Sequence, residues 1–104
     1  MSKAYVVIQF NLINQELFGK YVRATLPLIL SSGGQVMVAA ENLSPLEGSV
    51  PTARTTVLEF PSREAAETWY NSSEYNAVKH LRHDATSNGS LVILDAWKKP
   101  AGMP

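Results

Sequence analysis

Residues Ala4–Phe10, with the sequence AYVVIQF, are apolar, β-branched and aromatic, and they predict a β-strand. Alternate residues of a strand point to opposite faces of its sheet. Here Val6 and Ile8 fall on one face while Tyr5 and Val7 fall on the other, so both faces are apolar. A sheet with helices on one side and water on the other would instead alternate apolar and polar residues. The segment therefore predicts a sheet that is covered on both faces.

Three further segments have the composition of strands. They lie at Gln35–Ala40, Arg54–Phe60 and Leu91–Trp97. Glu41–Pro51 is polar and contains two prolines, which predicts a loop, and Asn88-Gly89 predicts a turn just before the last strand. The last strand is again apolar on both faces, as the first is.

Helices are expected between these strands. Asn14, Ser62 and Ser72 each stand where a helix N-cap is favoured. The first helix should end at Gly33-Gly34, and Pro27 should bend or shorten its last turns. The resulting order, β-α-β-β-α-α-β, is the split βαβ pattern of an α+β, ferredoxin-like fold with one four-stranded antiparallel sheet. We assign residues 1–97 to a single domain and residues 98–104 to a flexible C-terminal tail.

Composition excludes several classes of protein. The chain has 104 residues and no cysteine, so it can form neither a disulfide scaffold nor a thiolate metal site. Nine Lys and Arg balance nine Asp and Glu, which argues against nucleic-acid binding through counterion release. No apolar run reaches the roughly 18 residues of a membrane helix, and the N-terminus lacks the pattern of a signal peptide. We therefore expect a cytoplasmic protein that binds neither nucleic acid nor membrane.

The second apolar face of the sheet needs a cover. Most oligomers are symmetric, so a second copy of the same sheet is the simplest candidate. The alternative is that Glu41–Pro51 and the tail fold over this face. An exposed apolar sheet would promote aggregation. We expect a homodimer that forms through the sheet.

Several short motifs surround the second predicted helix and two glycine-containing connections. They are Phe60-Pro61-Ser62, Ala65-Ala66, Trp69-Tyr70, Ser72, Glu74-Tyr75, Gly33-Gly34 and Leu46-Glu47-Gly48. Between about Tyr5 and Asp95, these motifs resemble the family named domain of unknown function 1330. The resemblance implies the dimeric α/β barrel superfamily, which includes cofactor-free monooxygenases, muconolactone isomerase and chlorite dismutase-like haem proteins. The family itself has no established general activity, so the resemblance does not imply a particular reaction. Family members often carry Arg-Gly-Gly after the second strand, where this chain has Ala40-Glu41-Asn42.

Arg82 is the most informative polar residue. On a helical wheel it falls between Tyr75 and Val78, on the face that we expect to contact the apolar layer. A guanidinium in that position needs a carboxylate, carbonyl oxygens or a ligand anion. Arg82 could hold the carboxylate or enolate of a ligand. The alternative is that its stem packs while its head reaches water or pairs with a glutamate.

Glu59 is the candidate general base. The expected antiparallel pairing of the first and third strands places it near Tyr5, and a carboxylate beside aromatic side chains can have a raised pKa. The alternatives are a salt bridge or a position at the rim of the sheet. If Glu59 and Arg82 face one cavity, they could also simply pair with each other.

Four inward-facing residues could complete a ligand site. Tyr21 and Thr25 lie on the inner face of the first helix, and Trp69 and Tyr75 lie on the inner faces of the two later helices. Each can equally be an ordinary core residue. His80 and His83 fall on a solvated helix face, and no third metal ligand converges on them, so we expect neither a metal nor a cofactor.

These observations favour a small dimeric protein that binds a partly apolar anion between its helices and its sheet. It could also transform that molecule by cofactor-free acid–base chemistry. The alternative is a non-catalytic dimer whose inner polar residues only satisfy one another. A cavity of about 300 Å³ or more beside an unpaired Arg82 would favour the ligand site.

Overall fold

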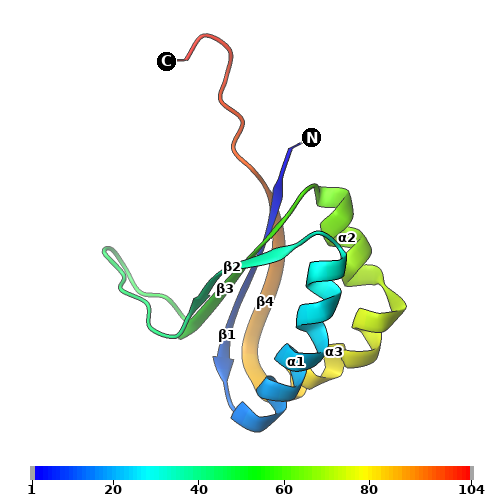
Figure 1. Ribbon diagram of the computed structural model, residues 1–104. Helices are drawn as coiled ribbons and strands as arrows, with labels where there is room; N and C mark the ends of the chain where they lie inside the picture. The colour runs from blue at the N-terminus through cyan, green and yellow to red at the C-terminus, as the bar shows by residue number, and fades with distance from the viewer. Residues whose placement is uncertain (1, 104) are drawn as a thin grey trace.

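A computed structural model of the chain describes residues 2–103 and shows one four-stranded antiparallel sheet, with the strand order β2-β3-β1-β4. The strands are β1 (Ala4–Leu12), β2 (Gln35–Ala40), β3 (Arg54–Phe60) and β4 (Thr86–Asp95). The helices α1 (Gln15–Ser31), α2 (Arg63–Asn71) and α3 (Ser73–Ala85) lie on one side of the sheet (Figure 1). This is the predicted α+β, ferredoxin-like arrangement.

The three predicted N-caps are present. The side chains of Asn14, Ser62 and Ser72 accept hydrogen bonds from the third residue of their helices at 3.0–3.1 Å. Pro27 was expected to bend or shorten the last turns of α1; it does not shorten the helix, which continues to Ser31. One missing N–H in the penultimate turn removes one hydrogen bond without preventing the next.

The region before the last strand differs from the prediction. β4 begins at Thr86 and not at Leu91, and Asn88-Gly89 lies inside the strand and does not form a hairpin turn. Asn88 has a φ of 53°, and the ladder with β1 shifts register between Gln9 and Asn11, as at a β-bulge. Asn and Gly are favoured both in hairpin turns and at β-bulges, so the Asn88-Gly89 pair alone does not show which of the two structures forms. At its other end β4 stops at Asp95, so Trp97 lies outside it.

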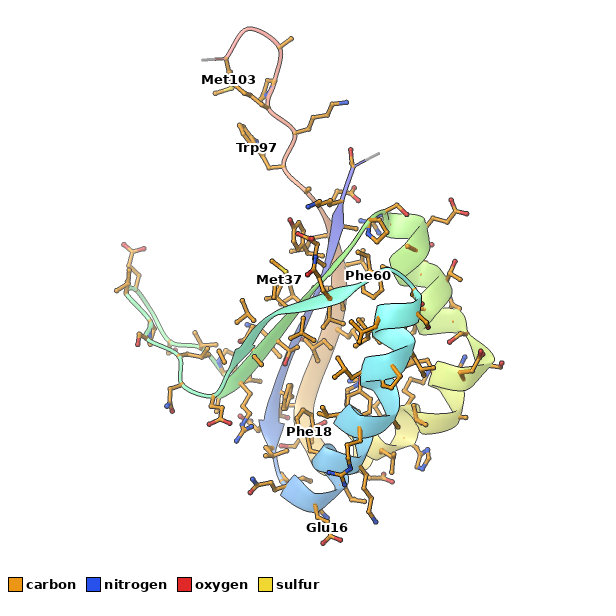
Figure 2. All side chains as sticks on the ribbon, in the orientation of Figure 1. Glu16, Phe18, Met37, Phe60, Trp97 and Met103 are labelled. Carbon is orange, nitrogen blue, oxygen red and sulfur yellow. The ribbon has the colours of Figure 1, made fainter. Side chains whose placement is uncertain are left out.

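The core lies between the helices and the sheet. Alternate residues of β1, including Val6 and Phe10, are buried on the helix side. Trp69 and Tyr75 are the largest fully buried side chains, and they meet this strand face from α2 and α3. Phe18 and Phe60 occupy the same layer (Figure 2). The helices therefore cover this face of the sheet.

The other face of the sheet is open. Val92 and Leu94 of β4 remain 47% and 51% exposed, and Met37 on β2 is also exposed. The loop between β2 and β3 and the chain after β4 both extend away from the sheet (Figure 1), and Trp97 on the latter is exposed (Figure 2). Residues 2–103 thus leave this apolar face uncovered. No helix within residues 2–103 is long and apolar enough to cross a membrane.

Replacement of Gly34 by alanine should destabilise the protein. A Cβ atom there would lie 2.7 Å from a ring carbon of Phe60 and 3.0 Å from Ile29, so the α1–β2 connection would have to shift. Such overpacking typically costs about 1–3 kcal/mol. Urea unfolding at a fixed protein concentration measures this loss. Gly19→Ala, inside α1 with only an arginine side-chain end nearby, is the control and should stabilise the helix. Equal midpoints for the two variants would contradict this account.

Candidate functional site

A cavity of about 130 Å³ lies between α1 and the sheet. Its walls are almost entirely apolar and come from α1 and strands β1, β2 and β3. Val22, Leu26 and Val36 line it and are partly exposed, which places them at its outer edge. Its polar lining residues include Tyr21, Thr25 and Arg82.

Arg82 is buried, with only 5% of its surface exposed. Its Nε donates to the Tyr75 hydroxyl at 3.3 Å, and its Nη2 lies 3.3 Å from Nε2 of His83. Among residues 2–103, no carboxylate forms an ion pair with it. A buried charge normally has an anionic partner, because transfer of an ion from water into a protein costs several kcal/mol.

Two tyrosines extend the polar contacts of Arg82. The hydroxyl of Tyr75, its hydrogen-bond partner, lies 2.9 Å from the hydroxyl of Tyr21. Burial and the neighbouring Tyr75 raise the pKa of Tyr21 far above its usual range, so its hydroxyl stays neutral. Thr25, one turn further along α1, has a buried hydroxyl with no hydrogen-bond partner among the described residues. The structure therefore brings together four of the sequence candidates: Tyr21, Thr25, Tyr75 and Arg82.

Glu59 and Tyr5 lie elsewhere, on the open face of the sheet. The Tyr5 hydroxyl donates to Oε2 of Glu59 at 3.0 Å, Gln35 donates to Oε1 at 3.2 Å, and Lys3 Nζ lies 3.4 Å from the same oxygen. The expected proximity of Glu59 and Tyr5 is therefore present. Leu58 and Phe60, on either side of Glu59 in β3, are buried in the core, so Glu59 itself points away from the helices.

The structure contradicts a raised pKa for Glu59, and the condition for its pairing with Arg82 is not met. The hydrogen bond from Tyr5 and the charge and hydrogen bonds of Lys3 and Gln35 lower the pKa of Glu59, although burial opposes them. It therefore lacks the raised pKa expected of a general base. It also does not share a cavity with Arg82, because the alternation of strand β3 puts the two side chains on opposite sides of the sheet.

Trp69 does not line the cavity and is a core residue. Its ring centroid lies 4.4 Å from that of Tyr75 and 5.5 Å from that of Phe60. Its indole N–H is buried without a hydrogen-bond partner among residues 2–103. His80 and His83 are both exposed on α3. In the part of the chain that the structure describes, no three His, Cys, Asp or Glu side chains are grouped as metal ligands would be.

Sequence reasoning missed the contribution of β2 and of His83. Val36 and Ala39 form part of the cavity wall, although the sequence of β2 gave no sign of which face meets α1. A register shift between Val36 and Val38 breaks the alternation in this strand, so simple periodicity misplaces its residues. His83 directly follows Arg82, a signal that was available in the sequence.

Residues 3–97 match the family described as a domain of unknown function, DUF1330. The chain belongs to this family. A protein of unknown function from Rhodopseudomonas palustris is similar in structure, with a TM-score of 0.75 and 17% identity over 94% of this chain and 85% of that chain. A dimeric ferredoxin-like protein of unknown function from Jannaschia sp. CCS1 has a TM-score of 0.66 and 12% identity, over 92% and 99% of the two chains.

A further similar structure belongs to a protein of named activity. SnoaB, a cofactor-independent oxygenase from Streptomyces nogalater, has a TM-score of 0.63 and 8% identity, over 99% of this chain and 100% of that one. Identity this low establishes a shared fold only. A search of curated proteins finds no match.

Neutralisation of Glu59 should remove a pH-dependent part of the stability. Because the folded pKa lies below the unfolded value of 4.5, ionised Glu59 stabilises the fold above that pH, and this contribution is lost as the pH falls through the folded pKa. Glu59→Gln should therefore lower the free energy of unfolding near about pH 7, and the difference should shrink below about pH 4.5. Urea unfolding at several pH values measures it. Glu47→Gln, in the exposed loop, should show no such trend; an unchanging deficit for Glu59→Gln would contradict the assignment.

Proposed function

We propose that each subunit of a homodimer binds a small, partly apolar anion in the cavity beneath α1. One observation carries this proposal: Arg82 is buried beside an apolar cavity, and no carboxylate of the described chain neutralises it. A carboxylate or enolate of a ligand would supply the missing charge. The unpartnered hydroxyl of Thr25 offers a second polar contact in the same cavity.

The size of the cavity limits the ligand. At about 130 Å³ it is smaller than the 300 Å³ that a typical ligand pocket reaches. It is close to an engineered apolar cavity of about 150 Å³ that takes up benzene. The apolar part of the ligand is therefore about the size of one ring or a short branched chain, with its acidic group at Arg82.

The same site would support cofactor-free chemistry on an activated carbon acid that is acidic enough to enter as its enolate, because none of the residues that line the cavity is a base that could take its proton. Arg82 would stabilise the negative charge of an enolate, and the neutral hydroxyl of Tyr21 would donate a hydrogen bond to it. Glu59 takes no part, since it lies on the other face of the sheet. SnoaB is a cofactor-independent oxygenase on the same fold, which is an analogy in support of this chemistry.

The second candidate is a dimer without a small-molecule site. The hydrogen bond from Arg82 to Tyr75 and the modest volume of the cavity favour it. Binding experiments separate the two candidates directly.

Benzoate should bind, and neutral benzamide should bind at least tenfold more weakly. A hydrogen bond to a charged group is worth about 1.5–3 kcal/mol, which corresponds to a factor of ten or more in affinity. Isothermal titration calorimetry measures both ligands on the unaltered protein and on Arg82→Met, which should lose the preference for benzoate.

A second pair of variants guards against misfolding of Arg82→Met. Val22→Trp should close the outer edge of the cavity and abolish benzoate binding, while leaving Arg82 unchanged. Leu30→Trp places the same ring on α1 at an exposed position outside the cavity and should bind normally. Equal affinity for benzoate and benzamide, or unaltered binding by Val22→Trp, would favour the dimer without a ligand site.

The open sheet face supports dimerisation of this chain. Val92 and Leu94 would be buried against the equivalent face of a second copy, as a symmetric interface requires. Similar structures from Jannaschia sp. and Thermobifida fusca are described as dimeric.

Val92→Glu should convert the dimer to a monomer in sedimentation velocity, because it would place two like charges in a desolvated contact. Leu30→Glu, at an exposed position on α1, should remain dimeric. A monomeric unaltered protein would refute the dimer, as would a Val92→Glu variant that dimerises with undiminished affinity.

A further inference from the structure

A second hollow lies between α3 and β4. It is a polar cleft of about 420 Å³, and Arg82 lines both this cleft and the apolar cavity. Its other walls include Tyr70, His83, Thr86 and Ser90. No acidic residue lines it. The guanidinium is thus shared between an apolar hollow and a polar one.

Arg82 has donors to spare at this cleft. A guanidinium carries five N–H groups. The described contacts use two of its nitrogen atoms, Nε toward Tyr75 and Nη2 toward His83. Tyr70 also lines the cleft, and its hydroxyl forms no side-chain hydrogen bond within residues 2–103. Ser90 pairs with Gln9 in the β1–β4 ladder, so its side chain points to the open face of the sheet and not toward α3. The unused N–H groups of Arg82 therefore remain available to an acceptor in the cleft.

The position of Arg82 and His83 in the last turn of α3 could also reflect a favourable interaction with the C-terminus of the helix. Cations at a helix C-terminus interact favourably with the exposed carbonyl groups there. Two of these carbonyls already have partners, however. Thr86 Oγ1 donates to the carbonyl of Arg82 at 2.7 Å, and the amides of Ile13 and Asn14 donate to that of Ala85 at 2.9 and 3.1 Å. Capping of the helix therefore does not account for a buried guanidinium.

The charges around the cleft favour an anion. Lys79 Nζ lies 5.0 Å from the centre of the Tyr70 ring, which adds a third basic group beside Arg82 and His83. Asp84 is the acidic neighbour of His83, and β4 contributes only uncharged residues to the cleft. Burial, followed by the charges of Arg82 and Lys79, lowers the pKa of His83 despite Asp84. The ring can then accept a hydrogen bond from Arg82 while the cleft is empty of an anion.

We propose that this cleft binds the phosphate group of a small molecule, with Arg82, His83 and Tyr70 as its ligands. Polar groups supplied by both α2 and α3 suit a tetrahedral oxyanion better than a planar carboxylate, which a single guanidinium can bind on its own. The volume of the cleft exceeds that of phosphate alone, so an organic phosphate monoester fits as well. This site is separate from the cavity that the proposed function uses, although Arg82 belongs to both.

Inorganic phosphate is the first probe, with sodium chloride at equal ionic strength as its control. Titration of ¹⁵N-labelled protein near pH 7 should move the amide resonances of Gly89 and Ser90, and the chloride control should not. His83→Gln changes an exposed residue and Tyr70→Phe removes only a hydroxyl group, so both variants should fold. Each should weaken phosphate binding about three- to tenfold, the usual loss for one hydrogen bond. Unmoved resonances, or undiminished affinity in both variants, would overturn the proposal.

A second comparison identifies the source of the phosphate. Glycerol 3-phosphate that binds more tightly than inorganic phosphate would assign the cleft to an organic monoester, whereas equal affinities would assign it to the free ion. Glycerol itself should not bind. Val22→Trp should leave phosphate binding intact while it abolishes benzoate binding, and His83→Gln should weaken phosphate binding while it leaves benzoate binding intact. Failure of one site therefore remains distinguishable from failure of the other.

Discussion

The burial of one positive charge constrains the rest of this structure. The guanidinium of Arg82 sits at the end of α3 against the core, where an ion without a partner costs several kcal/mol. Tyr75 meets part of that cost by accepting a hydrogen bond, and Tyr21 in turn contacts Tyr75. The contact between α1 and α3 thus runs through a polar chain inside an otherwise apolar layer. A core selected only for stability would place a methionine or leucine at this position. We propose that an anion from outside residues 2–103 supplies the missing charge.

The sheet divides the molecule into two chemically distinct sides. On the helix side, apolar residues of β1 and β3 enclose the core and the cavity beside Arg82. On the open side, Tyr5, Glu59 and Gln35 form a hydrogen-bonded polar group at one end of an apolar surface. A glutamate with satisfied hydrogen bonds and a lowered pKa suits a subunit contact, because it is already paired before the second copy arrives. In our proposal, ligand binding and dimerisation use opposite faces of this sheet.

The sequence predicted the order of elements and the two-faced sheet well, because strand composition, helix caps and apolar periodicity agree along most of the chain. The sequence-based prediction failed where one local pattern is compatible with two different structures. Asn88-Gly89 suits both a turn and a bulge, and only the pairing with β1 decides between them. The burial of Arg82 followed from its place on the helical wheel. The sequence did not show that Glu59 lies on the face away from the helices, because its pairing with Tyr5 does not reveal which face of the sheet the helices cover. That property depends on the long-range register between β1 and β3.

A crystal structure of the protein with 4-bromobenzoate tests the central claim most directly. The bromine atom locates the ligand through its anomalous scattering, independently of the fit of the protein. The account predicts a bromine peak in the apolar cavity beneath α1, near Ile29, with the carboxylate within hydrogen-bond distance of Arg82. A bromine peak only at other places, or an Arg82 paired with a carboxylate from a second copy of the chain, would contradict it.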